Sequence, residues 1–172
     1  NFSADNINTD VLWQEVVALS ENPKSWDGAE PFLREGRSPH GAFVKVYLND
    51  TALNHIQGEN TPPMPAGSYI VKENCNEERT LEAYTIMVKS QGFNPDGGDW
   101  YWAKITKDGE FQNEGAIITC VGCHSACDEH DYLFLHPFGD EQSCNERQVA
   151  QEQAQTEQAN QSPVSSEEVW NT

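Results

Sequence analysis

The middle of the chain contains four strand-like segments, and their spacing limits the folds that the chain can adopt. Each segment is rich in β-branched and aromatic residues, and turn-forming residues separate them: 42–48, 68–73, 81–89 and 100–106. Short connections join antiparallel strands, whereas parallel strands need long crossovers, usually through a helix. The spacing therefore favours an antiparallel sheet.

Two helices are predicted outside these strands. The apolar residues of 9–20 fall on one helical stripe, made of Val11, Leu12, Val16 and Leu19. This pattern predicts an amphipathic N-terminal helix whose stripe packs on the core. A shorter helix is predicted at 50–57, directly after the first strand.

The composition changes abruptly after Cys144. Residues 145–161 are dominated by Gln, Glu and Ala, and 162–172 adds Pro163 and several serines. The first part can be helical by propensity, but it has almost no apolar stripe to bury. We therefore expect one folded domain at 1–144 and a Gln- and Glu-rich peripheral tail at 145–172, which suits a chain of 172 residues.

The charge of the chain excludes several classes of partner. Ten Lys and Arg against 28 Asp and Glu give a formal charge of -18, which repels nucleic acid phosphates and anionic lipid surfaces.

The sequence contains no run of about 18 apolar residues, so we expect a protein that does not span a membrane. It starts at Asn1 without a visible signal segment, as expected of an exported, periplasmic protein after cleavage.

The segment Cys120-Val121-Gly122-Cys123-His124 has the spacing of a haem-attachment site. Two cysteines separated by two residues can both form thioether bonds to the vinyl groups on one edge of the macrocycle, and the next histidine then lies under the iron. We predict one covalently attached haem c, held by Cys120 and Cys123, with His124 as the iron ligand. The predicted fold is α+β: an antiparallel sheet with an N-terminal helix and a C-terminal haem-carrying helix or loop.

Two other chemistries use a similar pair of cysteines. A zinc site needs a second pair of ligands, and the nearby Cys127, His130 and His136 form no recognisable pair. A redox CxxC more often follows a strand and opens a helix in a thioredoxin-like βαβ unit, which this strand-rich chain lacks. Haem is the preferred interpretation.

The residue on the other side of the iron is not evident from the sequence. A vacant position binds small molecules, whereas a His/Met iron mainly transfers electrons. No motif surrounds any of the candidates, which are Met64, Met87, His40, His55, His130 and His136.

The chain resembles the cytochrome P-460 family, which includes the cytochrome c′-beta proteins. The resemblance covers about 39–134 and rests on an ordered series, HGAFVKVYLND, AGSYIVKEN, TIMVKSQGFNPDGGDWYWAKI and CVGCHSACDEHDYLF. It implies a small homodimeric domain built on an antiparallel sheet, with a five-coordinate iron and His124 as its proximal ligand.

The resemblance also implies further site residues. In the hydroxylamine-oxidising members a strand lysine is cross-linked to the haem, and the matching position is Lys72, with Lys89 in a similar context. Those members use a distal carboxylate as a base, and such a base must reach the proton that it removes. Glu114 is the candidate by position, with Glu110 as its alternative.

Three further cysteines, Cys75, Cys127 and Cys144, lie outside the haem motif. A disulfide in an oxidising compartment explains them most simply, either Cys75–Cys127 or Cys127–Cys144.

Three functions follow from these features. The first is a haem oxidoreductase acting on hydroxylamine or nitric oxide, the second a module that binds nitric oxide or carbon monoxide without turnover, and the third an electron-transfer cytochrome within a larger assembly. The acidic surface indicates a basic redox partner protein.

Overall fold

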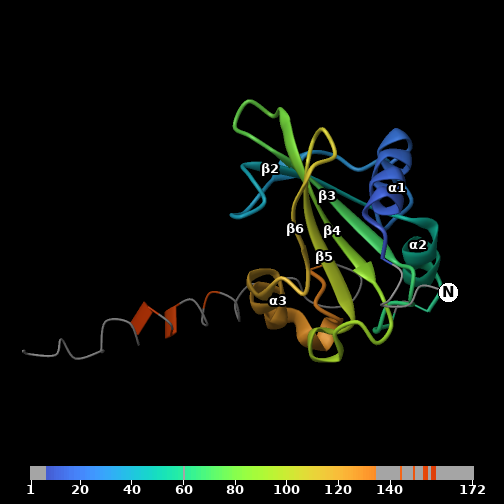
Figure 1. The fold of residues 1–172 in the computed structure, drawn as a ribbon, viewed down its shortest axis with the longest axis vertical. Helices are drawn as coiled ribbons and strands as arrows, with labels where there is room; N and C mark the ends of the chain where they lie inside the picture. The colour runs from blue at the N-terminus through green and yellow to red at the C-terminus, as the bar shows by residue number, and fades with distance from the viewer. Residues whose placement is uncertain are drawn as a thin grey trace, which may run out of the picture.

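The computed structural model describes residues 7–59 and 61–134, together with 144, 149, 153–154 and 156–157. Its centre is one six-stranded antiparallel sheet in which every strand pairs with its neighbours in the sequence, in the order β1-β2-β3-β4-β5-β6 (Figure 1). The strands are β1 (Arg34–Glu35), β2 (Phe43–Leu48), β3 (Tyr69–Cys75), β4 (Leu81–Lys89), β5 (Trp100–Thr106) and β6 (Phe111–Gly115).

The two faces of the sheet are covered by different helices. One face, here called the α1 face, carries buried side chains such as Tyr47, Val71 and Ile105, and α1 (Thr9–Glu21) packs Leu12 and Val16 onto it. The opposite α3 face carries Val46, Ile70, Met87 and Trp102 and lies toward α3 (Ile118–His124). The two helices lie on opposite sides of the sheet (Figure 1).

Asparagine side chains set the starts of both N-terminal helices. The side chain of Asn8 accepts hydrogen bonds from the backbone of α1, and that of Asn49 accepts one from Ala52 N in α2 (Asp50–Gln57). These contacts satisfy backbone donors that the first helical turn leaves free. Asn49 also accepts from Tyr69 N and donates to Gly67 O, so it joins α2 to the start of β3.

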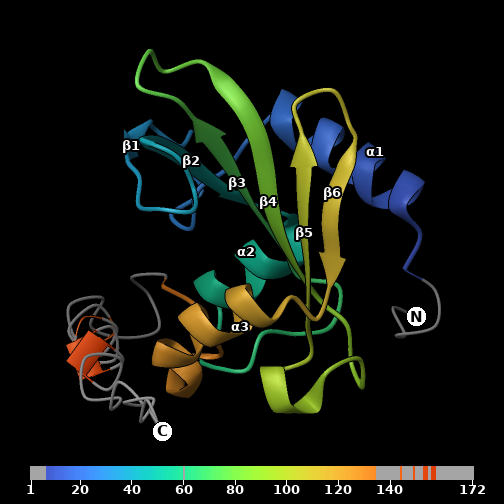
Figure 2. The same cartoon turned by 60° about the vertical axis from the view of Figure 1, so that its left-hand side comes forward.

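Short helical turns complete the part that positions the site. The 3-10 turn η2 (Pro95–Gly97) lies between β4 and β5, and η3 (Ser125–His130) continues directly from α3. Figure 2 shows α2 and α3 below the strands, with the loop between β1 and β2 to one side.

The α+β fold with an N-terminal helix, an antiparallel sheet and a C-terminal helix is confirmed. The segments 50–57, 81–89 and 100–106 have the predicted bounds. The sheet also contains β1 and β6, which the sequence did not indicate, because β1 has only two residues and the central residues of β6 are polar and exposed. Val11 was predicted to belong to the buried stripe of the N-terminal helix, but it is 48% exposed, and the buried residues of α1 are Leu12 and Val16.

Most of the segment predicted as a peripheral tail, 145–172, lies outside the described residues. The division at residue 144 therefore stays a prediction. Within the part of the chain that the structure describes, no helix combines the length and apolar character needed to cross a membrane.

Candidate haem site

The helix α3 carries Cys120, Cys123 and His124 within seven residues. Residues three apart in a helix share a face, so the two cysteines lie one above the other on α3. Both are partly buried, and Cys120 packs against the apolar cluster of the α3 face. The spacing that was read from the sequence therefore occurs on a helix that lies against the sheet.

His124 is buried and has one defined hydrogen bond. Its Nδ1 lies 2.8 Å from the backbone oxygen of Tyr132. A carbonyl oxygen only accepts, so Nδ1 carries the proton and Nε2 keeps the lone pair that a metal needs. Burial, followed by the charge of Lys72, lowers the pKa of His124 to about 4, which keeps the imidazole neutral.

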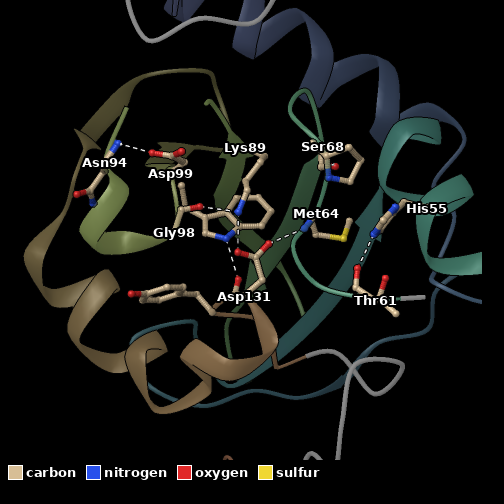
Figure 3. Close-up of polar contacts among 12 residues, drawn as sticks. His55, Thr61, Met64, Ser68, Lys89, Asn94, Gly98, Asp99 and Asp131 are labelled. Atoms are coloured by element: carbon tan, nitrogen blue, oxygen red, sulfur yellow. Dashed lines mark hydrogen bonds and ion pairs between the residues drawn. The ribbon is translucent and has the colours of Figure 1, made fainter. Parts of the chain in front are cut away.

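A buried ion pair holds the segment that supplies this carbonyl. The Nζ of Lys89, at the end of β4, lies 2.6 Å from Oδ1 of Asp131 and also donates to Gly98 O (Figure 3). The other carboxylate oxygen of Asp131 accepts from Met64 N at 2.7 Å, and its backbone oxygen accepts from Trp100 Nε1 at 2.8 Å. Asp131 thus connects its own segment, immediately before Tyr132, to three others, which contain Lys89, Met64 and Trp100.

The loop before β5 fixes Tyr132 from its other side. Gly98 has a φ of +67°, and a Cβ on it would lie 2.7 Å from the Tyr132 ring. The Tyr132 hydroxyl donates to Asp96 O at 2.9 Å. The backbone oxygen that orients His124 is therefore held through both the side chain of its own residue and the preceding Asp131.

Lys72 lies on the α3 face, in a row of cross-strand neighbours that contains polar residues in β3, β4 and β5. The β-sheet register aligns Val46, Lys72, Thr85 and Lys104 across β2 to β5. Burial lowers the pKa of Lys72 to about 8, while the neighbouring Cys123 acts in the opposite direction. Lys72 is thus within electrostatic range of Cys123 and His124, whereas Lys89 is held in its ion pair with Asp131.

Glu114 is not brought to this site. It pairs with Ala103, which belongs to the cluster on the α1 face, and it accepts a hydrogen bond from the Tyr101 hydroxyl. His124 lies on the other side, where its ring contacts Trp102 with centroids 4.7 Å apart. The alternative, Glu110, is exposed in the β5–β6 turn, where the neighbouring Gly109 packs against Trp13 of α1.

His40 was one of six candidates for the second iron ligand, and no sequence motif distinguished it from the others. It lies in the loop between β1 and β2, and its ring contacts that of His124 with centroids 6.3 Å apart. Burial, then Lys72, His124 and Lys104, lower the pKa of His40 to about 3. No local motif could have identified His40, Tyr132 or Asp131, because each reaches the site through contacts that are distant in the sequence.

Cys127 forms a disulfide with Cys144, which resolves the two pairings left open by the sequence. The bond attaches residue 144 to η3, immediately after the CxxCH helix. Cys75 is buried at the end of β3.

These residues fit a covalently bound haem. The donor set is two adjacent thiols and one neutral imidazole with its Nε2 available. Trp102 Nε1, beside His124, is buried and has no hydrogen-bond partner among the described residues, and an acidic substituent of the macrocycle can supply one. Lys72 and Lys104 add positive charge that suits the propionates of haem.

Comparison with known proteins gives one family. A protein-family model described as Cytochrome P460 matches residues 21–135, which covers the sheet, α3 and η3. No curated protein matches the chain.

Proposed function

Because the chain belongs to the cytochrome P460 family, we propose that it is an exported, monohaem c-type cytochrome whose iron binds or transforms a small nitrogen species such as hydroxylamine or nitric oxide. One haem c is attached through Cys120 and Cys123, and His124 is the proximal ligand. The observation that carries the proposal is the pair of cysteines on α3 together with the buried His124.

The bound haem supplies the redox-active iron and a coordination position for a small molecule. The residues of the chain orient and surround it. Tyr132 O holds His124 in the tautomer that ligates through Nε2 and raises its basicity by accepting from Nδ1. The apolar α3 face excludes water from one side of the site.

Lys72 is the residue we assign to the covalent cross-link of the hydroxylamine-oxidising relatives. Its support is electrostatic proximity to Cys123 and His124, which the alternative Lys89 does not share because it is paired with Asp131. The function also needs a coordination position on the iron that a small molecule can reach, and the family resemblance implies a five-coordinate iron in which this position is vacant.

Binding without turnover is the second candidate, and the position of Glu114 favours it. Oxidation of an N–H bond by the proposed route needs a base within reach of the ligand. Glu114 accepts a hydrogen bond from the Tyr101 hydroxyl on the α1 face, so its carboxylate is not within reach of a ligand on the α3 face. In a turnover enzyme, the electrons removed from hydroxylamine pass to a redox partner protein, for which the acidic surface favours a basic one.

Mass spectrometry of proteolytic haem peptides tests the attachment and the cross-link together. We expect the haem to be joined to the peptide of Cys120 and Cys123 and, through Lys72, to a β3 peptide. Lys72→Met removes the second peptide, whereas Lys104→Met, two strands away in the same row, leaves it in place. If the haem of the wild-type protein is joined only to the cysteine peptide, the proposal of hydroxylamine oxidation loses its main support.

Carbon monoxide and hydroxylamine separate the two functions. Steady oxidation of hydroxylamine with an added electron acceptor supports the enzyme, while reversible binding of carbon monoxide or nitric oxide without turnover supports the binding module.

A homodimer, implied by the family resemblance, is checked by light scattering on the same holoprotein. A protein without covalent haem contradicts both functions.

A further inference from the structure

Two consecutive residues in the segment that orients His124 have an uncommon backbone conformation. Asp131 has a φ of +58° and Tyr132 a φ of +65°. This left-handed region is uncommon for residues other than glycine, and for a bulky residue such as tyrosine it is an outlier. Such a conformation persists only where the surrounding contacts hold it, and it occurs mostly at functional sites. The turn at Asp131 and Tyr132 therefore needs an anchor.

The turn directs a carbonyl oxygen at the imidazole of His124. Tyr132 O lies 2.8 Å from His124 Nδ1, eight residues earlier in the chain. Tyr132 N donates to Cys127 O at 2.8 Å, so the chain folds back onto η3. The place of this carbonyl relative to the imidazole depends on the backbone conformation of both Asp131 and Tyr132.

The side chain of Asp131 anchors the turn. Its two oxygens accept from different donors, Lys89 Nζ at 2.6 Å and Met64 N at 2.7 Å (Figure 3). Lys89 also donates to Gly98 O at 2.6 Å, and a Cβ on Gly98 would overlap the Tyr132 ring. Because Lys89 ends β4, an interior strand of the sheet, the ion pair attaches the turn to the sheet.

A buried ion pair is a weak source of stability when compared with a well-packed apolar pair. The side chains of Lys89 and Asp131 are 9% and 5% exposed, so both charges have lost most of their water. The attraction between two such charges often does no more than offset that desolvation. Hydrogen bonds are directional, however, and they fix the orientation of the Asp131 carboxylate in a way that apolar contacts do not. Positioning is therefore what this pair contributes beyond stability.

We propose that the Lys89–Asp131 pair sets the reduction potential of the iron by fixing the hydrogen bond that His124 donates through Nδ1. This role rests on haem attachment beside His124, which is part of the proposed function. An acceptor held on the outer nitrogen makes an imidazole more basic and a stronger ligand. A stronger ligand stabilises ferric iron, so a weakened hydrogen bond raises the potential. Lys89 and Asp131 are positioning residues, since both act through Tyr132 O.

Redox titration of the holoprotein tests the proposal. Asp131→Asn breaks the ion pair, and the outer partners of a ligating histidine typically change its properties about tenfold or more. We expect the equilibrium between ferric and ferrous iron to shift about tenfold toward the ferrous state, which for one electron is about 59 mV. The frequency of the iron–histidine stretching vibration in the ferrous resonance Raman spectrum should fall, because it reports the strength of that bond.

A double variant separates positioning from charge. Asp131→Asn leaves the Lys89 ammonium unpaired, and an unpaired positive charge also raises the potential. Lys89→Met combined with Asp131→Asn removes both charges, so the stability should recover in part. The turn stays without its anchor to β4 in this protein. We therefore expect its potential and its stretching frequency to remain shifted although its stability recovers.

Asp128→Asn is the matched control for the loss of one carboxylate. Burial, followed by the charges of nearby carboxylates that include Asp128 and Asp131, raises the pKa of Tyr132. Both carboxylates thus act on the same residue, but Asp128 is exposed and lies outside the ion pair. Its substitution should shift the potential much less than either variant of the pair.

Two results overturn the proposal. One is a wild-type potential in Asp131→Asn with its haem attached. The other is a double variant with the wild-type potential and stretching frequency, because the whole effect then comes from the unpaired charge. If Asp131→Asn does not fold, the double variant decides alone, a shifted potential supporting the proposal and a wild-type potential refuting it. Either refutation leaves the proposed function standing, whereas a wild-type protein without covalent haem contradicts the proposed function itself.

Discussion

The buried ion pair between Lys89 and Asp131 gives the sharpest stability prediction. Their side chains are only 9% and 5% exposed, and Lys89 Nζ is 2.6 Å from Oδ1 of Asp131. Asp131→Asn changes the charge and little else. The residue has a φ of +58°, which Asn adopts more readily than most residues, and the amide oxygen can still accept from Met64 N.

The expected cost follows from leaving one charge without its partner. Removal of one member of a buried pair costs about 3 to 5 kcal/mol, because the other charge stays desolvated. In Asp131→Asn that charge is the Lys89 ammonium, which keeps only Gly98 O and the Trp100 ring as neighbours among the described contacts. The melting temperature should fall by about 10 °C or more.

Chemical denaturation of the holoprotein at constant pH measures this free energy. The matched control is Asp108→Asn, whose partner Lys107 lies with it on the surface, with side chains 78% and 54% exposed. That change should cost less than about 1 kcal/mol. The double variant Lys89→Met with Asp131→Asn removes both charges and should recover part of the loss.

The reasoning fails if Asp131→Asn costs no more than the surface control. It also fails if the effects of Lys89→Met and Asp131→Asn are additive, since a direct pair must show coupling. A Soret band shift in Asp131→Asn is expected as well, because Tyr132 follows directly and its oxygen orients His124.

Three further substitutions test neighbouring features. Gly98→Ala should destabilise the protein by about 1 to 3 kcal/mol, because its Cβ would overlap the Tyr132 ring and its φ is positive; thermal unfolding measures this change. Cys144→Ser should lower the free energy of unfolding by about 3 kcal/mol through loss of the bond to Cys127 across 17 residues, and reductant should have little further effect. Glu114→Gln should leave the ligand-bound haem spectrum unchanged, and a clear shift would contradict its location on the α1 face.

The local patterns of the sequence predicted most of the fold. The bounds of β4, β5 and α2 follow from apolar alternation, helical periodicity and the turn residues between them. The strand β6 could not be predicted in this way, since the strand character of its polar residues comes from pairing with β5. In such a segment the extended conformation is stabilised by pairing with the neighbouring strand, and the intrinsic strand propensity of its residues contributes little.

The sequence predicted only those site residues that lie close to one another in the chain. Cys120, Cys123 and His124 lie at fixed offsets, and the sequence suffices to recognise them. Lys72 and Lys89 occur in similar strand contexts. The structure distinguishes them because it pairs Lys89 with Asp131, which is 42 residues away in the sequence.

Glu114 was chosen by its distance from the motif, but alternation along β6 turns it to the face opposite His124. Position in the sequence alone therefore cannot assign a distal base.

The strand order of the sheet separates strand pairing from the contacts that orient His124. Because each strand pairs with the next in the sequence, all strand pairings lie within residues 34–115. The carboxylate that neutralises the buried Lys89 ammonium lies beyond them, in the segment that follows α3. The same short segment supplies Tyr132 O to His124. A single segment outside the sheet therefore both completes the buried ion pair and orients the proposed iron ligand.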